Sequence, residues 1–145
     1  MVFSNRDQGW NLTVSVRAVE IVGVIAGVIV GVALAAAGVF KLIDGPGWPK
    51  QAADMGVPRA IALVVPWIEI ILGAVLISQL VRPWPAIAAI ALLVMFTLVI
   101  VTRLLDGSRP PCACFGTRST RPLGAYHVAR NVVLLALAAV AAAWA

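Results

Sequence analysis

The chain has 145 residues, of which 62% are hydrophobic and 12% charged, and its formal net charge is +5. A soluble domain of this length needs polar outer faces, which so apolar a sequence does not supply. The basic residues are dispersed through the loops, which argues against a nucleic-acid-binding surface. We therefore expect an integral membrane protein that contacts lipid and acts within the membrane or at its surface.

Four apolar stretches predict membrane spans at residues 17–41, 59–81, 85–105 and 124–144. Each is close to the ~20 residues with which a helix crosses a bilayer. The polar loops are short, so we expect one all-α domain over residues 1–145, a polytopic bundle of four transmembrane helices in the plasma (inner) membrane. Ala33-Leu34-Ala35 resembles a signal-peptidase site, but the apolar run is longer than the ~7–15 residues of a signal-peptide core, which favours an uncleaved span.

The first span carries Gly23, Gly27 and Gly31 at a spacing of four, which places them on one helix face. Small residues in such a row let a second helix backbone approach closely. We expect this face to be a helix-packing surface.

The segment "DGPGWPKQAADMGVP" follows the first span and predicts a break and then a short interfacial helix, from about Pro49 to near Gly56. Trp48 is expected at the level of the lipid headgroups. Pro66 predicts a kink inside the second span. The tight turn "RPWP" at 82–85 predicts that the second and third spans pack as an antiparallel hairpin.

Charged side chains occur within the predicted spans. Glu69 lies roughly 15 Å deep at ~1.5 Å per residue, where a carboxylate must be paired, protonated or in contact with water. Arg130 enters from the same face of the membrane, so we expect a Glu69–Arg130 ion pair with Asn131 or Lys41 as a further partner. Such a pair either stabilises the helix bundle or supplies a charge that the function uses. His127 is either a polar interface residue or a group that reaches the cysteines and stabilises a thiolate.

Both cysteines lie in "RPPCACFG", residues 109–116. A disulfide between Cys112 and Cys114 would close a small, constrained ring, which makes the bond easier to reduce. Arg109 and the neighbouring arginines favour the thiolate, and Gly116 allows a sharp exit from the loop. Half of a zinc site is a second interpretation, although the chain has one histidine and no further cysteine to complete it. Small loop residues without chemistry are the third interpretation. We assign no metal or other cofactor, because His127 alone is too little to indicate a haem or quinone site.

A family resemblance extends over most of the chain. "CACFG" is similar to the C-x-C-F-G motif of the methylamine-utilisation membrane protein family (MauE), which is related to the DoxX-like four-helix membrane proteins. "AAAGVFKLID" (35–44), "PWIEIILGAVLI" (66–77) and "HVARNVVLLALA" (127–138) resemble its first, second and fourth spans. The match begins at about residue 25, and the cysteine motif is its most specific part.

The resemblance implies a four-span protein tied to thiol–disulfide chemistry, with a thioredoxin-fold partner outside the cytoplasm. The family is associated with maturation of methylamine dehydrogenase, whose small subunit needs many disulfides. Ala113, where the family often has glycine, and Tyr126-His127, where tryptophan is common, depart from its pattern. By position, the resemblance implies a redox pair at Cys112 and Cys114 and membrane-embedded polar residues at Lys41, Glu69, Arg130 and Asn131.

The distribution of basic residues predicts the orientation. With four spans, both termini lie on one side, together with three basic residues, and the other eight lie on the side of the first and third loops. The positive-inside rule then places the cysteine loop in the cytoplasm and the termini outside. This conflicts with the extracytoplasmic partner that the resemblance implies. The alternative to a redox protein is a non-enzymatic subunit or chaperone of a larger membrane assembly, with the cysteines as a structural pair.

Overall fold

The computed structural model describes residues 5–107 and 124–144, which form five helices. These are α1 (Asn5–Ile43), α2 (Gly47–Asp54), α3 (Arg59–Ser78), α4 (Trp84–Leu105) and α5 (Ala125–Ala143). Four are long and apolar enough to cross a membrane: Thr13–Ile43 within α1, and the whole of α3, α4 and α5. The chain is a multi-pass, all-α membrane protein, and the predicted fold class is confirmed.

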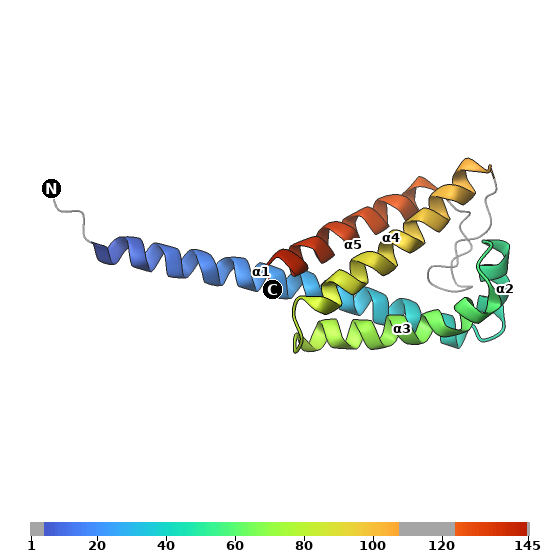
Figure 1. Cartoon of the computed structure of the whole chain (residues 1–145), viewed down its shortest axis with the longest axis horizontal. Coiled ribbons are helices and arrows are strands. Elements are labelled where there is room, and N and C mark those ends of the chain that lie inside the picture. Colours follow the sequence, from blue (N-terminus) through green and yellow to red (C-terminus); the bar gives the residue numbers. More distant parts are fainter. Residues whose placement is uncertain (1–4, 108–123, 145) are drawn as a thin grey trace.

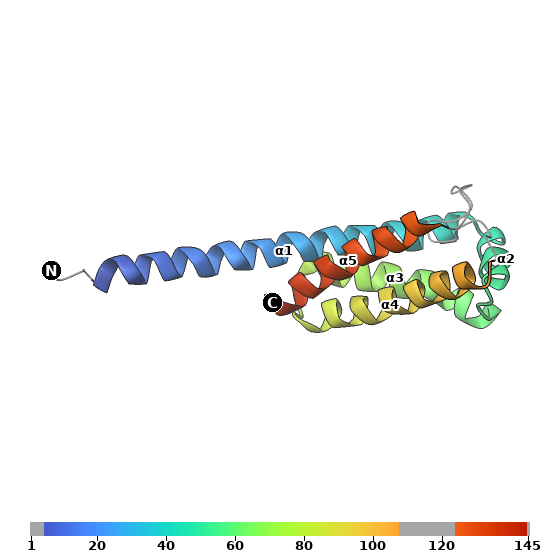
Figure 2. The same ribbon diagram turned by 90° about the horizontal axis from the view of Figure 1, so that it is seen from above.

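The first and second helices differ from their predicted bounds. α1 begins at Asn5, and its N-terminal part projects beyond the other helices as a single rod (Figures 1 and 2). Residues 13–22 are exposed, and burial begins at Gly23. Hydropathy marks only the apolar part of a helix, so the polar turns before residue 17 gave no span signal. The short helix α2 begins at Gly47 and not at Pro49.

The four long helices form a bundle in which α1 packs against both α3 and α5, and α4 packs against α5. α2 packs against α3 at the end of the bundle where α4 ends and α5 begins (Figures 1 and 2). The connection between α3 and α4 runs from Gln79, which has a φ of 56°, to Pro83, so it starts three residues before the predicted turn at 82–85. The two helices then diverge, and they touch only sparsely (Figure 1). The hairpin therefore leaves the outer face between α3 and α4 open.

The backbones of α1 and α3 touch. A Cβ added at Gly31 would lie 2.8 Å from the carbonyl oxygen of Gly73, and one added at Gly38 would lie 2.5 Å from that of Pro66. Only glycine permits so close an approach, because a methyl group would overlap the facing backbone. Gly27 and Gly23 face different neighbours, the Gln79 and Ala141 side chains and the backbone of Trp144 respectively. The glycine row thus lies against α3 at one end and α5 at the other.

Two groups of buried apolar side chains fill the bundle. The first combines alanines, among them Ala26, Ala89 and Ala138, with leucines, and its residues come from all four long helices. The second lies under α2 and contains Trp48, Ala52, Met55, Ala62, Val65 and Ile100. Many large apolar side chains point outward from the spans, as expected of helices that face lipid. Trp48 of the second group and Phe96, which packs against it, also contact the buried lysine described next.

Candidate functional site

The predicted cysteine site lies outside the described residues. Arg109, Cys112, Cys114 and Gly116 all belong to the segment between Gly107 and Gly124. The helices on either side show where this segment is attached. α4 ends and α5 begins at the end of the bundle where α2 lies (Figure 1). The cysteine-bearing segment is therefore joined to the bundle at the α2 end.

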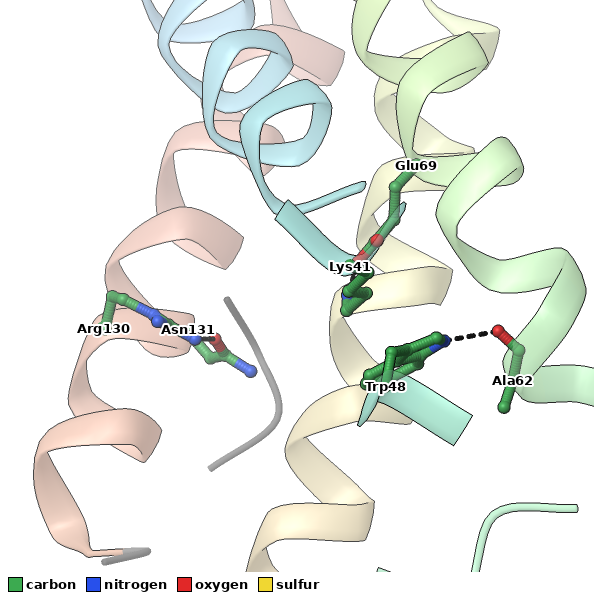
Figure 3. A network of polar contacts seen from close by, with 6 residues as sticks. All are labelled: Lys41, Trp48, Ala62, Glu69, Arg130 and Asn131. Carbon is green, nitrogen blue, oxygen red and sulfur yellow. Dashed lines mark hydrogen bonds and ion pairs between the residues drawn. The ribbon is translucent and has the colours of Figure 1, made fainter. Parts of the chain in front are cut away.

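A buried ion pair lies near this end. The ammonium of Lys41, in the last turn of α1, contacts the Oε1 atom of Glu69 on α3 (Figure 3). Their side chains are 2% and 1% exposed. The close approach of α1 to α3 at Gly38 and Pro66 brings the two residues together. A cation with a C-terminal helix end on one side and a carboxylate on the other is well compensated.

Two aromatic rings complete the surroundings of the ammonium. Lys41 Nζ lies 4.9 Å from the ring centres of both Trp48 and Phe96, within cation–π range. The indole Nε1–H of Trp48 donates to the carbonyl oxygen of Ala62 (Figure 3). We call Lys41, Glu69, Trp48 and Phe96 the lysine cluster. It joins α1, α2, α3 and α4.

The burial of Trp48 corrects its predicted place at the lipid headgroups. Its side chain is 7% exposed and belongs to the core under α2. α2 folds back over the bundle, so the ring meets Lys41 instead of lipid. Trp84, at the start of α4, is 68% exposed and is free to contact the membrane interface.

The predicted Glu69–Arg130 ion pair is also corrected, because Glu69 pairs with Lys41, which the sequence analysis names only as a further partner. Arg130 Nη2 instead donates to Asn131 Oδ1 at 3.2 Å (Figure 3). Asn131 Nδ2 donates to Thr97 Oγ1 on α4 at 3.3 Å. Depth alone suggested the Arg130 partner, but α3 packs against α1 while α5 packs against α4 and α1. The polar residues therefore form two groups, the lysine cluster and an α4–α5 contact.

His127 lies in the first turn of α5 and is 5% exposed. Its Nδ1 atom accepts a hydrogen bond from the backbone N–H of Gly124 at 3.3 Å. Its ring meets that of Tyr126 edge to face, with centroids 5.7 Å apart. The histidine is thus packed into the bundle directly after the cysteine-bearing segment. Its action on a thiolate stays a prediction.

Sequence reasoning missed Phe96 and Thr97 as partners of the polar residues. Both lie inside an apolar span, where neither charge nor spacing marks them. Trp48 had one local signal: it follows a lysine at a helix end by seven residues, across a Gly-Pro-Gly break. Its contact with Lys41 depends on how that break folds.

The fold and the lysine cluster define a small multi-pass membrane protein with a buried charge pair near one end of its bundle. A family model described as "Methylamine utilisation protein MauE" matches residues 19–145. The chain belongs to this family, which confirms the resemblance seen in the sequence. Neither the curated proteins nor the solved structures compared with the chain give a significant match.

Proposed function

We propose that the protein is a membrane thiol–disulfide redox carrier in which Cys112 and Cys114 form a reversible disulfide. It exchanges electrons with a thioredoxin-fold partner and so supports disulfide formation in a protein outside the cytoplasm. Methylamine dehydrogenase has this role of client in the family.

The observation that carries the proposal is the C-x-C pair within the matched range 19–145. Both thiols of the chain fall in one short segment between two spans, one residue apart, as a pair that exchanges a disulfide requires. Arginines at positions 109, 118 and 121 surround the pair in the sequence and favour its thiolate form.

The exchange proceeds through a mixed disulfide. A thiolate of the reduced partner attacks one sulfur of the Cys112–Cys114 disulfide, and the other cysteine leaves as a thiolate. The second partner thiol, once deprotonated, then attacks the mixed disulfide. The partner ends as a disulfide, and the cysteine pair takes two electrons and, on protonation, two protons. The lysine cluster supports this exchange by fixing the ends of α1, α2 and α3 near the attachment of the cysteine segment.

The cysteines must lie on the side of the membrane where the partner protein is. The basic residues favour a cytoplasmic loop, whereas a client outside the cytoplasm requires the opposite face. Side-specific labelling of the two cysteines decides between these orientations.

The test is replacement of the cysteines in cells that mature a disulfide-rich exported client. Cys112→Ser/Cys114→Ser should abolish client maturation, and Ala113→Ser, which changes the same segment but keeps both thiols, should not. A single variant, Cys112→Ser or Cys114→Ser, has no disulfide for the reduced partner to attack. Its remaining thiolate can instead attack the disulfide of the oxidised partner, and one of the two variants should accumulate the resulting mixed disulfide, which a reductant cleaves. Full client maturation with the double variant would favour the assembly-subunit alternative, in which the cysteines are structural.

A further inference from the structure

A cavity of about 200 Å³ lies beside the lysine cluster. It is bounded by the end of α1 and by α2, α3 and α4, and its walls include Lys41, Trp48, Ile61, Val65, Met95 and Phe96. A cavity of about 150 Å³ with apolar walls admits benzene, so this one has room for a substituted six-membered ring. Its walls are almost entirely apolar, and the ammonium of Lys41 is the charged group among them.

An open groove on the outside of the bundle adjoins the cavity at Met95, the residue that the two linings share. This open groove of about 690 Å³ runs between α3 and α4, where the two helices diverge. Met95 lines both the cavity and the groove, which then extends along α4 as far as Trp84. At ~1.5 Å per residue, this distance is roughly 16 Å. Ala88 and Ala91 line it on the α4 side and leave space for a chain-shaped ligand.

We infer that the cavity and groove bind an isoprenoid quinone, with the ring in the cavity and the apolar tail in the groove. A compact ring followed by a long apolar tail matches the shape of the combined space. The rings of Trp48 and Phe96 offer stacking surfaces. An ammonium has three N–H donors, so Lys41 can bond a quinone carbonyl while it keeps its contact with Glu69. A hydrated phospholipid headgroup does not suit walls so apolar.

This inference rests on the proposed function and supplies the electron acceptor that it needs. A Cys112/Cys114 pair that has oxidised its partner is left as a dithiol. The dithiol loses two protons and two electrons as its S–S bond forms, and the quinone gains them at its two carbonyl oxygens to become a quinol. The quinol leaves along the groove into the membrane. The cavity lies near the end of the bundle where the cysteine-bearing segment is attached.

Sequence reasoning gave no sign of this site, because its walls come from dispersed apolar residues on four elements. These residues do not form a sequence motif. Only the divergence of α3 from α4 and the return of α2 over the bundle create the space.

The test is saturable binding of a short-tailed ubiquinone or menaquinone to the purified full-length protein in nanodiscs. A photoreactive azidoquinone should label peptides from α2, α3 or α4. Ile61→Trp, at the 47%-exposed rim, and Val65→Trp, in the wall, should raise the dissociation constant by about tenfold or more because they fill the cavity. Val64→Trp is the matched control: its side chain is 54% exposed and outside the cavity, so it should leave binding unchanged.

Two further arms separate this site from the proposed function. Cys112→Ser/Cys114→Ser should bind quinone as tightly as the unchanged protein, since the cavity does not use the thiols. If Ile61→Trp leaves both quinone binding and the oxidation of the two cysteines intact, the quinone site is overturned. The redox proposal would still stand, because the cysteines would still be oxidised and reduced. Displacement of the quinone by a long-chain hydrocarbon without a ring, at equal concentration, would show a lipid-tail site and would also overturn it. Thermal melts of each variant establish that it is folded.

Discussion

Replacing Glu69 by leucine should strongly destabilise the protein, because it leaves the ammonium of Lys41 buried without its carboxylate. Two unit charges at about 4 Å attract by about 4 kcal/mol at an effective dielectric constant of about 20. Removing one partner of a buried pair costs about 3–5 kcal/mol of unfolding free energy. With side chains 2% and 1% exposed, Lys41 and Glu69 belong in this class. The rings of Trp48 and Phe96 offset only part of the loss.

Lys41→Met should cost a similar amount, since it leaves the carboxylate buried instead. The double variant Lys41→Met/Glu69→Leu should recover most of the stability, because a well-packed apolar pair often replaces a buried ion pair at little cost. The coupling free energy between the two positions is thus expected to be about 3 kcal/mol.

Reversible unfolding in mixed micelles, with SDS titrated against a mild detergent and helicity followed by circular dichroism, measures these free energies. The matched control couples Glu69→Leu with Arg130→Leu on α5, where the coupling should be far smaller. Additive effects of the Lys41 and Glu69 substitutions, or a stronger coupling of Glu69 to Arg130, would refute the lysine cluster as the structure has it.

Three further substitutions test the packing. Gly31→Leu should lower the free energy of unfolding by about 1–3 kcal/mol, because it forces α1 away from α3. The control Val32→Leu changes the neighbouring residue, which is 53% exposed, and should change that free energy by less than about 0.5 kcal/mol. The same SDS titration measures both variants. Trp48→Phe keeps an aromatic ring but loses the indole hydrogen bond, so about 0.5–1.5 kcal/mol should be lost by thermal melting. Thr97→Val removes the acceptor of the Asn131 amide and should cost about 0.6–1.7 kcal/mol, an effect that should vanish in an Asn131→Leu background.

The spans were predictable because the bilayer fixes the length of each apolar helix. α3 and α4 begin within one residue of their predicted starts, and α5 begins at Ala125. The N-terminal extension of α1 was not predictable in this way, since its first turns, before Thr13, are too polar to give a hydropathy signal. The glycine row indicated close packing, but the sequence did not tell that Gly31 lies against α3 while Gly23 lies against α5.

The residues of the site were predictable, but their pairing was predictable only in part: Lys41 was named as a further partner of Glu69, whereas Arg130 was expected to be the main one. Lys41 and Glu69 stand out as charges in apolar surroundings, and burial requires each to be compensated. Which cation meets the carboxylate depends on which helices are neighbours, and depth along a span does not contain that information. The place of Trp48 depended in the same way on the fold of the Gly-Pro-Gly break.

The most direct test of the redox account is the oxidation state of Cys112 and Cys114 in intact cells. Cells are treated with a membrane-impermeant maleimide, with and without mild reduction, and the mass shift is read. The account predicts that the maleimide labels the two thiols only after reduction. Labelling of intact cells would place the cysteine segment outside the cytoplasm, and labelling only after lysis would place it inside. Labelling of both thiols in lysed membranes without any reduction, under conditions that preserve disulfides, would contradict the account.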